Sequence, residues 1–226
     1  MAAGHSSVVQ TDTRTRLLRA ALAVFAHRDF EAVSVREIVD QAGANIAAIS
    51  YHFGGKQALY LATAEFLADA MQDQLGPTLA RIRADVEGAA PSAACRMLEG
   101  MIQQLVHSLT MDRLGEDAAG FILREQHQPT AAFDILYERL MKPIQETYQM
   151  LVSRMLGEPE SNRRRQVLIT HALMGQILAF RSARTTVLRR LDQADFSEQD
   201  AREIADVVSR LTLNALQARH TRKNRS

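Results

Sequence analysis

Apolar and polar residues alternate at helical spacing along most of the chain, and the pattern is clearest over residues 34–43. Four apolar residues recur there at i, i+3, i+4 and i+7: Val35, Ile38, Val39 and Ala42. Ser34 and Glu37 have the spacing of a capping box, and Gly43 follows the apolar stripe. The pattern predicts a short helix that buries one face and ends in a sharp turn.

A second short helix is predicted after this turn. Asn45 suits its N-terminal cap, and Ile49 and Phe53 form an inward-facing pair at i, i+4. The outward side chains are mostly small and all uncharged, so the helix backbone can come close to another surface. Two such helices around a glycine indicate a helix-turn-helix, whose second helix enters the major groove of DNA.

Several side chains of this motif are suited to DNA contact. Ser50 and Tyr51 can hydrogen-bond to bases or phosphates, whereas His52 and Lys56 lie where a donor reaches the flanking phosphates. The residues that we expect at the DNA are Ser34, Arg36, Asn45, Ile46, Ala47, Ala48, Ser50, Tyr51, His52 and Lys56.

The rest of the chain also has helical spacing, with breaks at glycine and proline. Gly76–Pro77 interrupts or kinks a helix that begins near residue 56, and another break falls at Gly88–Pro91. Further helices are expected up to about Leu109, over 115–127, from Pro129 to about Leu156, over 163–191 and over 197–218. Strand-like alternation is rare, so we predict an all-α fold.

The motif resembles the tetracycline-repressor (TetR) family, whose usual pattern is TxxxIAxxAGVSxxxLYxHFxxK; this chain has SVREIVDQAGANIAAISYHFGGK. The resemblance covers about residues 12–70. The first helix predicted in this region has a buried stripe of Leu18, Ala21, Leu22 and Phe25. Ser50 stands where many relatives have tyrosine, so a contact made by that tyrosine is not carried over. Further along, LREQHQPTAAF at residues 123–133 is similar to the C-terminal domain of CecR-type regulators.

This resemblance implies a three-helix DNA-binding domain followed by a helical domain that receives a ligand and dimerises. We expect a flexible arm at 1–11, the helix-turn-helix domain at 12–58, the regulatory and dimerisation domain at 59–218 and a basic tail at 219–226.

Residues 1–70 hold six Lys or Arg against seven Asp or Glu, a net charge of 6 − 7 = −1. Affinity from counterion release is therefore modest, and binding depends on geometry and a second subunit.

The resemblance places a ligand pocket among the middle helices. Its candidate lining residues are Met97, Met101, Leu105, Phe121, Arg124, Gln126, Phe133, Tyr137, Met141 and Tyr148. Thioether and aromatic groups suit an irregular apolar cavity, but they equally suit an ordinary helical core. For Arg124, Glu125 and Gln126, the alternative is an ion-pair lattice that fixes the bend before Pro129.

The last two predicted helices indicate a homodimer. The helix over 163–191 is apolar around nearly its whole circumference, so it must be covered on two sides. The residues that we expect in a four-helix dimer interface are Leu173, Ile177, Phe180, Arg184, Val208, Leu211 and Ala215. The alternative is that both helices are buried inside a monomer. A twofold dimer predicts a palindromic operator.

The sequence gives little support to a redox sensor, a secreted or membrane protein, an enzyme or a metal-binding protein. Cys95 is the only cysteine, so no intramolecular disulfide forms, and a redox-sensing role would require a lowered thiol pKa. No signal peptide or membrane span is expected, which indicates a cytoplasmic protein. No catalytic motif appears, so we expect neither an enzyme nor a cofactor. A metal site built from His107, His127 and His171 is a less favoured alternative.

We therefore interpret the sequence as that of a ligand-responsive transcriptional regulator. It is expected to be a repressor that leaves a palindromic double-stranded operator when a small molecule enters its C-terminal domain. The alternative from another class is a helical ligand-binding or scaffold protein whose turn motif only packs and does not bind DNA.

Overall fold

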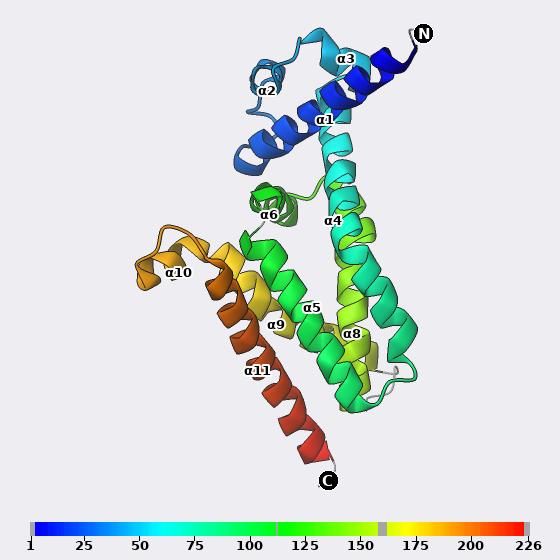
Figure 1. The fold of residues 1–226 in the computed structure, drawn as a ribbon, viewed down its shortest axis with the longest axis vertical. Coiled ribbons are helices and arrows are strands. Elements are labelled where there is room, and N and C mark those ends of the chain that lie inside the picture. Colours follow the sequence, from blue (N-terminus) through cyan, green and yellow to red (C-terminus); the bar gives the residue numbers. More distant parts are fainter. Residues whose placement is uncertain (1–2, 112, 158–161, 224–226) are drawn as a thin grey trace. The chain divides into compact units, whose positions relative to one another are not determined.

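The structure is a computed structural model that describes the backbone of residues 3–111, 113–157 and 162–223 (Figure 1). Side chains are described for residues 13–111, 116–157 and 162–217. All regular elements in these ranges are helices, which confirms the predicted all-α fold. Among the described residues, no helix is both long and apolar enough to cross a membrane.

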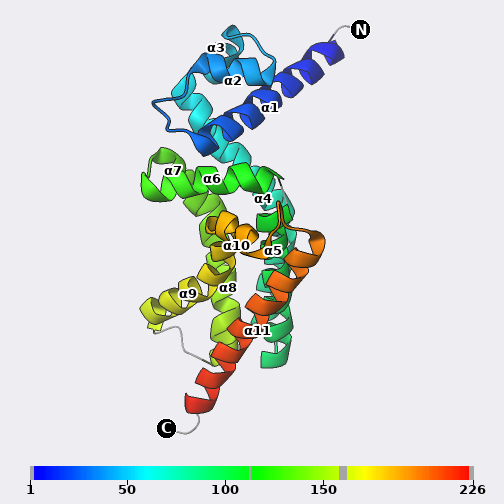
Figure 2. The same cartoon turned by 90° about the vertical axis from the view of Figure 1, so that its left-hand side faces the viewer.

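The helices follow one another in the order drawn in Figures 1 and 2. The N-terminal helices are α1 (Ala3–His27), α2 (Val35–Ala42), α3 (Ala47–Phe53) and α4 (Lys56–Val86). The middle elements are α5 (Pro91–Met111), α6 (Arg113–His127), α7 (Ala131–Leu136), a π-helix (Tyr137–Met141) and α8 (Lys142–Leu156). The last helices are α9 (Arg163–Ser182), α10 (Arg184–Leu191) and α11 (Glu198–Lys223).

The chain divides into two compact units. The first contains the residues up to Gln72 together with Glu116–Leu140, and the second contains Asp73–Gly115 and the residues from Met141 onward. Helix α4 begins in the first unit and ends in the second. It runs through Gly76–Pro77, so the helix is not interrupted where the sequence allowed a break. Leu75 and Ile82 are buried on either side of the proline, which favours continuing the helix.

An aromatic cluster forms the centre of the first unit. The ring of Tyr60 on α4 lies 4.7 Å from Phe25 on α1, 5.1 Å from Phe30 and 5.0 Å from Phe121 on α6, between ring centroids. Gly120 allows α6 to approach α1 closely, because a Cβ at this position would lie 2.8 Å from the carbonyl oxygen of Ala26. Helix α6 therefore packs directly on the N-terminal helices.

A buried carboxylate adds hydrogen bonds to this cluster. Glu125 is fully buried and accepts a hydrogen bond of 2.5 Å from the Tyr60 hydroxyl. It also accepts bonds of 3.0 Å from the backbone N–H and the hydroxyl of Thr130. Burial, followed by the nearby Glu125 carboxylate, raises the pKa of the Tyr60 phenol. Glu125 thus connects α4 with the segment that starts α7.

The neighbouring Arg124 connects α6 with α1. Its Nε donates a 3.1 Å hydrogen bond to the Phe25 carbonyl, and its guanidinium pairs with Asp29. The expected lattice around residues 124–126 therefore includes partners far away in the sequence. Arg124 and Glu125 fasten residues 116–140 to the helices that precede them, instead of pairing mainly with each other.

The second unit is a helical bundle. Helix α5 packs along α11 and α8, and α9 contacts both α5 and α8 (Figures 1 and 2). The helix predicted to run to about Leu156 is continuous from Ala131 and contains a π-helical turn between α7 and α8. The helix predicted over 163–191 is divided, because Ala183 has a non-helical backbone (φ −105°, ψ 22°) between α9 and α10. The hydroxyl of Ser182 donates to the Leu178 carbonyl, a type of bond that often bends helices.

Glu125→Ala should destabilise the first unit. The substitution leaves the buried Tyr60 hydroxyl and two groups of Thr130 without their acceptor, so we expect the free energy of unfolding to fall by about 1–3 kcal/mol. Urea denaturation measures this change. Glu65→Ala removes an exposed carboxylate from α4 and should cost less than about 0.5 kcal/mol. Equal losses in the two variants would contradict a structural role for Glu125.

Candidate functional site

The helix-turn-helix is held by local caps. The Ser34 hydroxyl accepts a hydrogen bond of 3.1 Å from the Glu37 N–H, as the sequence predicted for the start of α2. The Glu37 carboxylate does not complete the capping box, because it forms an ion pair of 2.7 Å with Arg28. Gly43 ends α2 in the left-handed region (φ 58°), where glycine has little strain. The turn predicted at Gly43 is confirmed.

Arg16 on α1 fixes this turn through a contact that the sequence did not predict. Its Nε donates to the Ala42 carbonyl at 3.0 Å, and its Nη2 donates to the Gly43 carbonyl at 2.5 Å. A cation at the end of a helix satisfies carbonyls that have no partner within the helix. These partners are 26 and 27 residues from Arg16 in the sequence, so no local pattern identifies them.

Helix α3 presents one open face. Asn45 caps its start, because the Asn45 Oδ1 accepts a hydrogen bond of 3.0 Å from the Ala47 N–H. Ile49 is buried, with 1% of its surface exposed, whereas Ile46 and Tyr51 are 56% and 71% exposed. The predicted DNA contacts that are exposed are Ser34, Arg36, Asn45, Ile46, Ala47, Ser50 and Tyr51, and the half-buried ones are Ala48, His52 and Lys56.

Two cations lie against aromatic rings beside α3. The Lys56 Nζ is 4.4 Å from the centroid of the Phe30 ring, which orients this predicted phosphate contact at the start of α4. The exposed Arg14 guanidinium on α1 lies 5.3 Å from the centroid of the Phe53 ring, at the end of α3. Arg14 is therefore a further candidate phosphate contact. Helical spacing alone does not show which part of α1 faces α3, so the sequence did not indicate this contact.

The predicted ligand-pocket residues are divided between the two units. Those in the first unit are Phe121, Arg124, Gln126, Phe133 and Tyr137, and those in the second are Met97, Met101, Leu105, Met141 and Tyr148. In the first unit, Phe121 belongs to the aromatic cluster and Phe133 stacks on Tyr137 at 6.0 Å. In the second, Met97 and Met101 line a cavity of about 330 Å³ between α4 and α5. The structure therefore brings only part of the predicted set together within either unit.

Buried polar atoms without partners gather in the second unit. For five buried oxygens the described residues provide no hydrogen bond of ordinary geometry: Tyr148 Oη, Thr170 Oγ1, Gln176 Oε1, Ser209 Oγ and Thr212 Oγ1. They come from α8, α9 and α11. Burial raises the pKa of Tyr148 to about 12, and the neighbouring Thr212 hydroxyl acts in the opposite direction. Buried polar atoms normally have partners, so these oxygens are candidates for hydrogen bonds to a ligand or to water.

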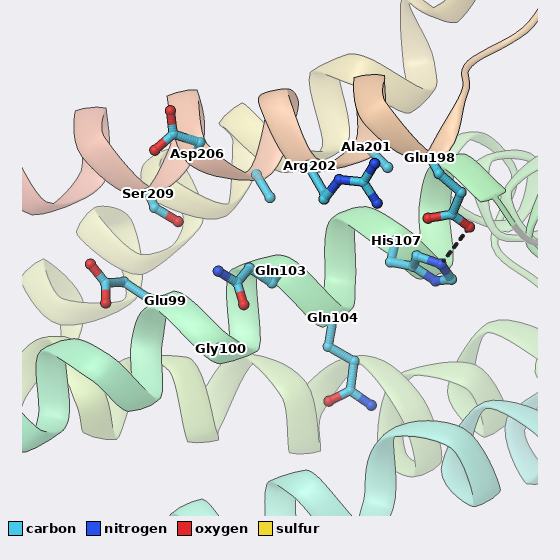
Figure 3. A pocket seen from close by; sticks show the side chains of 11 residues that line it. Glu99, Gly100, Gln103, Gln104, His107, Glu198, Ala201, Arg202, Asp206 and Ser209 are labelled. Carbon is cyan, nitrogen blue, oxygen red and sulfur yellow. Dashed lines mark hydrogen bonds and ion pairs between the residues drawn. The ribbon is translucent and has the colours of Figure 1, made fainter.

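A polar groove of about 700 Å³ lies between α5 and α11 (Figure 3). Figure 3 shows Glu99 and Gln103 on α5 opposite Arg202 and Ser209 on α11. At one end, His107 Nε2 lies 3.3 Å from a Glu198 carboxylate oxygen.

The metal and redox alternatives gain no support from the described side chains. No group of three or more His, Cys, Asp or Glu residues suited to a metal ion occurs among them. His127 lies in the first unit, whereas His107 and His171 lie in the second. Burial raises the pKa of the Cys95 thiol, which is the opposite of what a reactive thiolate requires.

The predicted dimer residues fall into two groups. Leu173, Ile177 and Val208 are buried within the protomer. Phe180 and Arg184 are half-buried, and Leu211 and Ala215 are exposed. Further large apolar residues are exposed on α9 and α11: Val167, Leu168, Leu178 and Val207. A helix that is apolar on all sides does not show in its sequence which face turns inward.

Two family models match the chain. Residues 17–63 match the bacterial regulatory proteins of the tetR family, and residues 94–219 match the C-terminal domain of the HTH-type transcriptional dual regulator CecR. A relative from Shigella flexneri, the HTH-type transcriptional dual regulator CecR, is 35% identical over 198 residues, which span 87% of this chain and 87% of the relative.

Solved structures share the fold at lower identity. AibR in complex with isovaleryl coenzyme A and operator DNA is 15% identical with a TM-score of 0.60, over 87% of this chain and 96% of that one. FadR from Bacillus subtilis in complex with stearoyl-CoA is 17% identical with a TM-score of 0.57, over 88% of this chain and 96% of that one. These two likenesses establish the fold alone.

The raised pKa of Tyr148 predicts a loss of stability at high pH. The folded protein holds the phenolic proton more tightly than the unfolded chain, whose tyrosines titrate near pH 10. The stabilising contribution is therefore complete below pH 10 and is lost as the pH rises from 10 through about 12, by at most about 1.4 kcal/mol per pH unit. Tyr148→Phe should remove this part of the slope in alkaline urea denaturation.

Tyr137→Phe is the matched control, because Tyr137 is 38% exposed. It should keep the pH dependence of the unaltered protein. If Tyr148→Phe keeps it as well, the Tyr148 phenol does not titrate abnormally in the folded protein.

Proposed function

The chain belongs to the TetR family of bacterial regulatory proteins, with a CecR-type C-terminal domain, and is a DNA-binding transcriptional regulator; we propose that it is a repressor released from a palindromic operator by a small molecule. The observation that carries this proposal is the exposed face of α3, held by the Gly43 turn and by Arg16. We place this function in the cytoplasm, where bacterial operator DNA lies.

DNA binding is proposed to depend on the close fit of α3 to the DNA and on the two helix-turn-helix domains of a dimer. The N-terminal region has almost no net charge, so general attraction to phosphate is weak. Small residues on α3 allow close docking, and Arg14, Lys56 and Arg36 are proposed to contact phosphates. A homodimer provides the second helix-turn-helix domain, and its twofold symmetry requires a palindromic site.

The proposed dimer interface lies on α9 and α11. Leu168 and Leu211 are 59% and 57% exposed, and Val167, Leu178, Val207 and Ala215 extend the same apolar character along the two helices. Exposed apolar residues on neighbouring helices favour association with a second copy, because a four-helix arrangement would bury them. Leu173, Ile177 and Val208 are proposed to support this interface from inside the protomer.

The inducer is proposed to bind in the core of the second unit. The oxygens of Thr170, Gln176 and Ser209 are buried without hydrogen-bond partners among the described residues, so a molecule with hydrogen-bonding groups would satisfy them. The cavity beside Met97 and Met101 is a second candidate site, lined by other residues of α4 and α5. The ligand class is proposed to be a small molecule with hydrogen-bonding groups.

Release from DNA is proposed to be a population shift. Helices α6 and α7 follow α5 in the sequence but belong to the same unit as α3, so the chain passes from the second unit to the first before Glu116 and returns after Leu140. A ligand that favours the state unable to bind the operator needs a coupling of only about 1–3 kcal/mol to change DNA affinity roughly 5- to 150-fold.

Selection from a random duplex library tests DNA binding. We expect the full-length protein to retain palindromic duplexes. Tyr51→Ala and Lys56→Ala should each weaken binding about tenfold, and Lys56→Ala should also reduce the slope of log affinity against log salt by about 1. Arg190→Ala, on the exposed part of α10, is the control and should leave binding unchanged. If no duplex is selected, the helical scaffold without DNA binding becomes the correct interpretation.

Sedimentation equilibrium tests the dimer. The unaltered protein should be dimeric at micromolar concentration, and Leu211→Glu should be monomeric because it places a charge in the apolar interface. Leu123→Glu changes an exposed leucine on α6 and should remain dimeric. A monomeric unaltered protein would rule out the proposed interface.

A further inference from the structure

The exposed face of α3 lacks the side chains that read most bases directly. Residues 46–53 contain no Arg, Lys, Asn, Gln, Asp or Glu. In the major groove, Arg or Lys pairs with guanine, Asn or Gln pairs with adenine, and Asp or Glu accepts from cytosine. The strongest hydrogen-bonded forms of base readout are therefore missing from this helix.

Asn45, directly before α3, does not supply the missing readout. Its Oδ1 already accepts the Ala47 N–H at 3.0 Å. A two-bond contact with adenine uses both the oxygen and the nitrogen of an amide side chain. Asn45 therefore shapes the start of the helix, and its oxygen is engaged in the cap.

Ile46 lies at the N-terminal end of α3. It is the residue immediately before α3, and 56% of its surface is exposed. Ile49, one turn away, supplies the buried contact of this helix, so Ile46 is not needed for the core. In helix-turn-helix proteins, the N-terminal residues of the second helix contact base edges.

The apolar group that a base presents in the major groove is the C5-methyl of thymine. We infer that Ile46, with the exposed Ala47 beside it, recognises a thymine methyl in each half-site of the operator. The small Ala47 lets the helix come close, and the branched Ile46 side chain covers the methyl group. Each half-site therefore contains an A·T pair opposite the start of α3. This inference rests on the proposed DNA-binding function of α3.

Deoxyuridine provides a direct test, because it differs from thymidine only by the missing methyl. A duplex is first selected from a random library with the unaltered full-length protein. Each thymine of that duplex is then replaced singly by deoxyuridine, and the dissociation constant is measured. We expect one position in each half-site where the replacement weakens binding about fourfold, the effect of losing one buried methyl-sized group. Replacements elsewhere should change binding less than about twofold.

A variant assigns this effect to Ile46. Ile46→Ala should weaken binding to the thymine duplex and should no longer distinguish thymine from deoxyuridine at the same position. Leu123→Ala shortens a comparably exposed leucine on α6 and should keep the full effect of deoxyuridine. Circular dichroism verifies that both variants are folded, and the deoxyuridine scan itself needs no variant.

The outcomes separate this inference from the proposed function. A tightly bound duplex that tolerates deoxyuridine at every position overturns the thymine contact and leaves DNA binding intact. An effect of deoxyuridine that persists unchanged in Ile46→Ala also overturns it, because another residue then reads the methyl. Failure to select any duplex overturns the proposed function itself.

Discussion

The carboxylate of Glu125 joins parts of the first unit that are far apart in the sequence. It accepts hydrogen bonds from Tyr60 on α4 and from Thr130 before α7, and it is fully buried. Burying a charged group is costly unless its hydrogen bonds are satisfied, so this geometry strongly favours one placement of α6 and α7. Arg124 adds a bond to α1. Residues 116–140 consequently belong to the unit that contains α3, although they follow α5 in the chain.

Local features of the sequence predicted much of the fold. The all-α class, the turn at Gly43, the cap at Asn45 and the end of α8 at Leu156 are confirmed, because each depends on neighbouring residues. The family matches likewise confirm the resemblance to TetR and CecR-type regulators. The sequence left open whether Gly76–Pro77 interrupts or kinks the helix. Helix α4 continues through both residues, because burial of Leu75 and Ile82 outweighs the helix-breaking tendency of proline.

Long-range contacts could not be predicted in this way. Arg16 binds carbonyls more than twenty residues away, and Arg124 binds a carbonyl 99 residues away. Helical periodicity shows that a face is buried but not what covers it. For this reason the sequence did not show that Leu173 and Ile177, which we expect at the dimer interface, are already buried within the protomer. The Thr212 hydroxyl beside Tyr148 was not predicted, because the two residues are far apart in the sequence.

Amide hydrogen exchange, with and without a selected operator duplex, tests the central claim that α3 reads DNA as part of a unit that includes α6 and α7. The account predicts slower exchange in residues 45–56 and in residues 116–140 when the duplex is bound, because these segments form one unit. Unchanged exchange in residues 45–56 on a duplex that the protein binds tightly would contradict it.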